Sequence, residues 1–149
     1  MERSIRIRLG LAAPIFGFVY FYLLVLLIGL ISSTLRPSWW IDIFPNRHAA
    51  AVMWLICLHT AAVVFAATPT AVAVVAIGRE RAVLLGVIVG VVATALAILA
   101  SLRPDIWQLA WSSHPIFFVT DQIKLLVAVP LAAWIILKLI SRRGSSATA

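Results

Sequence analysis

Four long apolar runs constrain this chain more than any other feature of its sequence. They extend over residues 11–31, 49–77, 82–100 and 115–140, and each contains 19 residues or more. An α-helix rises about 1.5 Å per residue, so roughly 20 apolar residues cross the hydrocarbon core of a bilayer. The sequence therefore predicts an all-α, multi-pass integral membrane protein, folded as a bundle of four transmembrane helices within a single domain, 1–149.

The composition leaves little room for a soluble domain. Hydrophobic residues make up 64% of the chain and charged residues 11%, whereas a soluble domain carries about 25% charged residues. The sequence contains no phosphate-binding glycine loop, zinc motif or recognisable nucleophile–base pair. We therefore expect a non-enzymatic protein with no catalytic residues and no metal site.

In a soluble protein a net charge of +7 would suggest binding to nucleic acid, but here the positions of the basic residues indicate how the chain is oriented in a membrane. Eight basic residues flank one side of the apolar runs and three flank the other, which is the bias expected from the positive-inside rule. We therefore expect the chain to lie in the lipid bilayer of a bacterial inner membrane, with both termini in the cytoplasm. We expect no nucleic acid as a partner. The eight are Arg3, Arg6, Arg8, Arg79, Arg81, Lys138, Arg142 and Arg143, and the three are Arg36, Arg47 and Arg103.

The boundaries of the runs give three further expectations. The first run has 21 residues, more than the roughly 7–15 of a signal-peptide core, so it is expected to stay as an uncleaved helix. The second run would form about 43 Å of helix, longer than a bilayer core, and we expect it to kink near Pro69. Residues 141–149 are small or polar and are expected to form a flexible tail.

Aromatic residues gather at the ends of the runs, where one edge of a ring meets lipid and the other meets water. We expect short interfacial helices in both outer loops, the first over residues 38–44. Each outer loop also contains Leu-Arg-Pro followed by aromatic residues, at an offset of 67 residues. This indicates either two tandem helical hairpins or convergent loop composition. The predicted interface anchors are Trp39, Trp40, Trp107, Trp111 and Trp134.

Small side chains repeat every four residues in the third run, at Gly86, Gly90 and Thr94. Such a stripe lets another helix approach closely in a membrane. It predicts a helix-packing face, used either within the bundle or by another protein.

The fourth run is unusual because it carries charge. Asp121 and Lys124 are three residues apart, so they share one helix face and are within reach of each other, with Gln122 beside them. Ionisable residues in a transmembrane segment are costly and mark either a functional site or a needed contact. The pair is interpreted either as a proton, ion or anion pathway, or as a structural pair that fixes the helix against its neighbours.

His59 lies in the middle of the second run, and Tyr20 and Tyr22 lie in the middle of the first. A haem or metal site would need a second ligand for His59, and no other run supplies a histidine at that depth. The alternative is a neutral histidine that is hydrogen-bonded to a backbone carbonyl or to one of the two tyrosines. Each tyrosine hydroxyl could equally form a hydrogen bond with Asp121. No cofactor is therefore expected, with haem as the alternative.

Three functions follow as hypotheses. The first is an accessory or partner-binding subunit of a larger membrane assembly, bound to another membrane protein or to copies of itself. The second is a small oligomeric transporter or ion pathway that uses Asp121 and Lys124. The third is a haem- or quinone-associated redox protein that uses His59.

Overall fold

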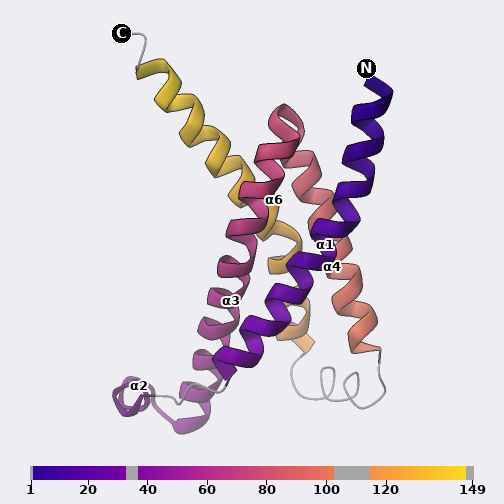
Figure 1. Ribbon diagram of the computed structural model, residues 1–149. Helices are drawn as coiled ribbons and strands as arrows, with labels where there is room; N and C mark the ends of the chain where they lie inside the picture. Colours follow the sequence, from indigo (N-terminus) through magenta and orange to yellow (C-terminus); the bar gives the residue numbers. More distant parts are fainter. Residues whose placement is uncertain (1, 33–36, 103–114, 147–149) are drawn as a thin grey trace.

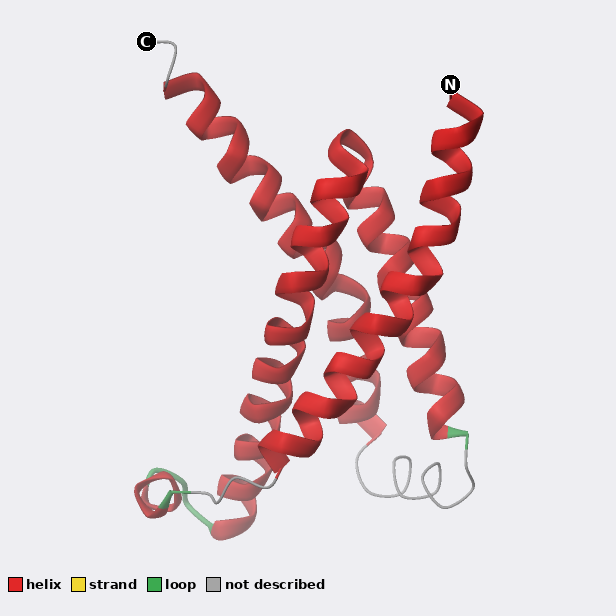
Figure 2. Ribbon diagram, viewed as in Figure 1, coloured by secondary structure: helices red, strands yellow, loops and turns green. Residues whose placement is uncertain are grey.

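The described part of the chain is almost entirely helical. The computed structural model describes residues 2–32, 37–102 and 115–146, which contain no strand (Figure 2). Three helical segments are long and apolar enough to cross a membrane, Leu11–Ile31, Arg47–Ser101 and Pro115–Arg142. The predicted all-helical class is thus confirmed, and the segment lengths are consistent with a membrane protein. The elements are α1 Glu2–Ser32, α2 Ser38–Asp42, α3 Arg47–Gly78, the 3-10 turn η1 Arg79–Arg81, α4 Ala82–Ser101 and α6 Pro115–Ser146.

The longest apolar segment, Arg47–Ser101, contains two helices because the chain reverses direction at η1 (Figure 1). Arg79 begins this turn with φ 45°, the only positive φ of a non-glycine residue among the described residues. Such a backbone conformation costs a side-chain-bearing residue on the order of 1 kcal/mol. A tight turn therefore joins α3 to α4, and the two helices pack against each other on either side of it.

The helices extend beyond the apolar runs. α1 begins at Glu2, and α6 continues to Ser146, so the predicted flexible tail is helical over residues 141–146. α3 is continuous through Pro69, whose missing N–H leaves the carbonyl of Phe65 without its usual donor. The kink near Pro69 stays a prediction.

The long helices pack so that each of α1 and α6 contacts both α3 and α4. The start of α1, the end of α6 and η1 lie at one end of the molecule, and α2 lies at the other (Figure 1). Nine of the eighteen buried hydrophobic side chains in the described part are alanines. Small buried side chains allow helix backbones to come close, while large apolar side chains such as Phe65 cover the outside.

A short helix is present in the loop between α1 and α3, as predicted, although it ends at Asp42. Trp40 joins this helix, α2, to the start of α3, since its Nε1 donates to the carbonyl of Ala50 at 2.8 Å. Its ring also packs against Trp54, with centroids 5.2 Å apart, while Trp39 lies exposed beside it. Trp107, Trp111 and the second copy of the repeated loop pattern lie outside the described residues, so the tandem-hairpin hypothesis stays a prediction.

Candidate functional site

Three ionisable side chains from two helices meet at one carboxylate oxygen. The Oδ1 atom of Asp121 lies 3.1 Å from Nζ of Lys124, which donates a hydrogen bond to it, and 3.0 Å from Nδ1 of His59. The histidine contact is within ion-pair distance, but its ring N–H is not aligned as a hydrogen bond requires. We refer to His59, Asp121 and Lys124 as the Asp121 cluster.

Helix geometry and helix packing each supply one part of this cluster. Asp121 and Lys124 are three residues apart in α6, so they lie on one face and pair within their own helix. His59 comes from α3, which packs along α6. The pair expected from spacing alone is therefore extended by a partner from a second helix.

The Asp121 cluster is only partly covered by the chain. The side chains of His59, Lys124 and Asp121 are 22%, 23% and 32% exposed. Nδ1 of His59 is itself buried, so the exposed part of the imidazole lies away from Asp121. Asp121 thus neutralises Lys124, while the cluster keeps an open side on the surface of the bundle.

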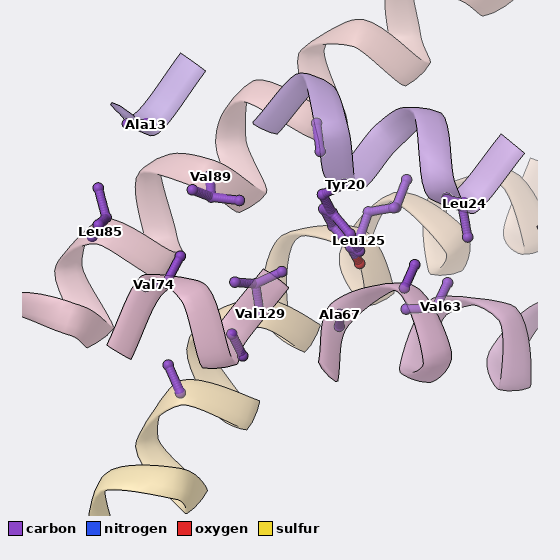
Figure 3. Close-up of a cluster of buried hydrophobic side chains, with 14 of the residues drawn as sticks. Ala13, Tyr20, Leu24, Val63, Ala67, Val74, Leu85, Val89, Leu125 and Val129 are labelled. Atoms are coloured by element: carbon purple, nitrogen blue, oxygen red, sulfur yellow. The ribbon is translucent and has the colours of Figure 1, made fainter. Parts of the chain in front are cut away.

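The tyrosines expected near His59 are placed differently from each other. Tyr20 is fully buried between the helices, and its hydroxyl has no hydrogen-bond partner within the described ranges (Figure 3). Tyr22 is 56% exposed on the outside of α1, where it stacks on Phe18 with ring centroids 6.4 Å apart. The structure therefore pairs His59 with Asp121, and Tyr22 does not join the site.

The two glycines of the small-residue stripe lie against α6. A Cβ atom added to Gly86 would lie 3.0 Å from Cα of Pro130, and one added to Gly90 would lie 2.5 Å from the carbonyl oxygen of Leu126. This stripe is therefore used within the bundle. A comparable close approach, not predicted from the sequence, occurs where Gly17 of α1 crosses Val92 of α4.

Two more predicted residues bring polar atoms into the interior. Oγ1 of Thr94 and Oε1 of Gln122 are both buried, and neither has a hydrogen-bond partner in the described part of the chain. Trp134 lies instead on the outside of α6, where Nζ of Lys138 sits 4.7 Å from the centroid of its ring. One polar atom each of Gln122 and Thr94 is thus covered, although both residues are only partly buried, whereas Trp134 belongs to the surface.

Few side chains in the described part of the chain are able to bind a metal or a cofactor. Residues 2–32, 37–102 and 115–146 contain no group of three His, Cys, Asp or Glu side chains able to hold a metal ion. A haem or quinone at His59 would have to use Nε2, because Nδ1 faces Asp121.

Comparison with protein-family models, with curated proteins and with solved structures finds no match to this chain.

The contact between His59 and Asp121 is the part of the Asp121 cluster that the sequence did not predict. Its only signal was that both residues are polar, lie inside apolar runs and need a partner.

Proposed function

We propose that this chain is a partner-binding subunit of a larger membrane assembly, and that the open side of the Asp121 cluster is part of its contact with another membrane protein. α1, α3, α4 and α6 each cross a bacterial inner membrane, and both termini and η1 lie on the cytoplasmic side. The end of the molecule that carries η1 also carries most of the basic residues, which supports this orientation.

The partial exposure of the Asp121 cluster carries the proposal. Counted from Pro115, Asp121 lies about 9 Å and Lys124 about 13 Å along α6, so both fall within the apolar segment. In the isolated chain, lipid would cover the exposed parts of these side chains, and an ionisable group at bilayer depth costs about 3 kcal/mol. A second protein that covers the open side with polar groups removes this cost, and lipid does not.

The experiment compares two variants that remove equal charge. The full chain is purified in native lipid nanodiscs, and its mass is measured by native mass spectrometry against the 16.2 kDa of one copy. The test variant is Asp121→Asn with Lys124→Gln. The control is Glu80→Gln with Arg81→Gln, an exposed pair in η1.

We expect the wild type and the control to retain a different membrane protein in fixed stoichiometry, and the test variant to lose it while staying folded. A photo-crosslinking amino acid in place of Ile123, 56% exposed beside the cluster, should capture the same protein. The same group in place of Ile15 on α1, 62% exposed, should not capture it. Wild-type protein that is always a single copy overturns the proposal.

A second candidate function is a small oligomeric proton or ion pathway, favoured by the meeting of three titratable groups at one oxygen. In liposomes containing the purified chain, Asp121→Asn and Lys124→Met should then each reduce proton or ion flux by at least tenfold. Glu80→Gln is the control and should leave flux unchanged. Flux that is the same in all variants excludes this candidate, and homo-oligomers without another protein favour it over the first.

A further inference from the structure

The last turns of α6 carry one aromatic ring and two cations on a single face. Trp134, Lys138 and Arg142 follow each other at intervals of four residues, so each lies above the previous one, about 6 Å further along the helix. All three side chains are exposed. We refer to these three residues as the α6 basic stripe.

The packing of α6 leaves this stripe open to lipid. Ala133 is fully buried, and Leu137 is partly buried where it packs against the core, so the inner face of α6 lies beside the stripe and does not include it. Beyond Leu137 the helix points away from the other long helices (Figure 1). A lipid molecule can therefore approach the stripe from the side without displacing any part of the bundle.

The spacing along α6 matches the layers of a bilayer. Counted from Pro115, Trp134 lies about 28 Å along the helix, and Lys138 and Arg142 follow at about 34 and 40 Å. The hydrocarbon core of a bilayer is about 30 Å thick, and the two headgroup layers bring the total to about 40–45 Å. With Pro115 at the opposite boundary of the core, the ring lies at the edge of the hydrocarbon and both cations lie at the level of the headgroups.

The charge of this segment has one sign. No acidic residue follows Asp121 in the sequence. Nζ of Lys138 lies 4.7 Å from the centroid of the Trp134 ring, and this contact holds the ammonium group over the ring face. A ring face attracts a cation without neutralising it, so the ammonium group still attracts an anion on its other side.

We propose that the α6 basic stripe binds an anionic phospholipid, phosphatidylglycerol, in the cytoplasmic leaflet. Lys138 and Arg142 donate to the phosphate oxygens, and Trp134 packs against the upper part of an acyl chain. A zwitterionic lipid offers the same phosphate but also brings a cation of its own into the site. The inference rests on the membrane orientation in the proposed function but not on the partner protein, so its failure leaves the role proposed for the Asp121 cluster intact.

Trp134 serves as the reporter of this site. The full chain is reconstituted in liposomes of equal parts phosphatidylglycerol and phosphatidylcholine, and one lipid at a time carries bromine on its acyl chains, which quenches a neighbouring tryptophan. The signal of Trp134 is the difference between the wild type and Trp134→Phe. Each cation should favour the anionic lipid roughly fivefold, so the lipid beside Trp134 should be phosphatidylglycerol with a preference of about thirtyfold.

Two double variants separate a lipid site from general surface charge. Lys138→Gln with Arg142→Gln should abolish the preference at Trp134. Arg79→Gln with Arg81→Gln removes the same charge from exposed positions on either side of Glu80 in η1, and it should leave the preference unchanged. Equal quenching of the wild type by both brominated lipids overturns the proposal, and so does a loss of preference in the η1 variant as large as that in the α6 variant.

Discussion

Gly90→Ala is expected to destabilise the folded bundle by about 3 kcal/mol, in the upper part of the range for overpacked cores. The added Cβ atom would lie 2.5 Å from the carbonyl oxygen of Leu126 and 3.1 Å from its carbonyl carbon. Both are backbone atoms of α6, so no side-chain rotation can relieve the overlap. The two helices must separate, and the contacts between them are weakened along their length.

The measurement is the unfolding midpoint of the full chain in detergent micelles, followed by tryptophan fluorescence. Gly86→Ala should have a smaller effect, because its Cβ atom would lie 3.0 Å from Cα of Pro130. Gly29→Ala is the matched control, since nothing lies within 4 Å of its added Cβ atom. Alanine is the better helix former by about 1 kcal/mol, so the control should be slightly more stable than the wild type. Equal midpoints for Gly90→Ala and Gly29→Ala would contradict this account of the interface.

Asp121→Leu is expected to destabilise the chain by about 3 kcal/mol, because it removes the carboxylate that accepts a hydrogen bond from Lys124 and lies at ion-pair distance from His59. Lys124 then remains as an unpaired cation within an apolar segment. Adding Lys124→Leu to this variant should restore most of the lost stability, since no charge is left without a partner. The rescue separates the cost of a stranded charge from a general effect of changing α6.

Unfolding in a series of SDS concentrations provides the measurement for these variants in mixed micelles. Glu80→Leu is the control, because it removes an exposed acid in η1, and it should shift the midpoint little. If the double variant is as unstable as Asp121→Leu alone, the stranded lysine is not the cause, and the Asp121 cluster has another structural role.

The candidate site divides into parts that were predictable and parts that were not. Spacing in the sequence placed Lys124 within reach of Asp121, and Nζ of Lys124 lies 3.1 Å from Oδ1 of Asp121. Spacing within one helix does not say how α3 is aligned along α6, so the approach of His59 to the same oxygen could not be derived. Residue type likewise failed to separate Tyr20, which is fully buried, from Tyr22, which is exposed.

Composition along the chain was sufficient to predict the helical class, the positions of the long apolar segments and the unusual charges of α6. Which face of each helix lies inside is visible only in the folded bundle. In a soluble protein the apolar stripe of a helix marks its buried face. Here the outside is as apolar as the core, so hydrophobicity carries no such signal, and the close approach of small residues such as Gly90 to α6 fixes the inner faces instead.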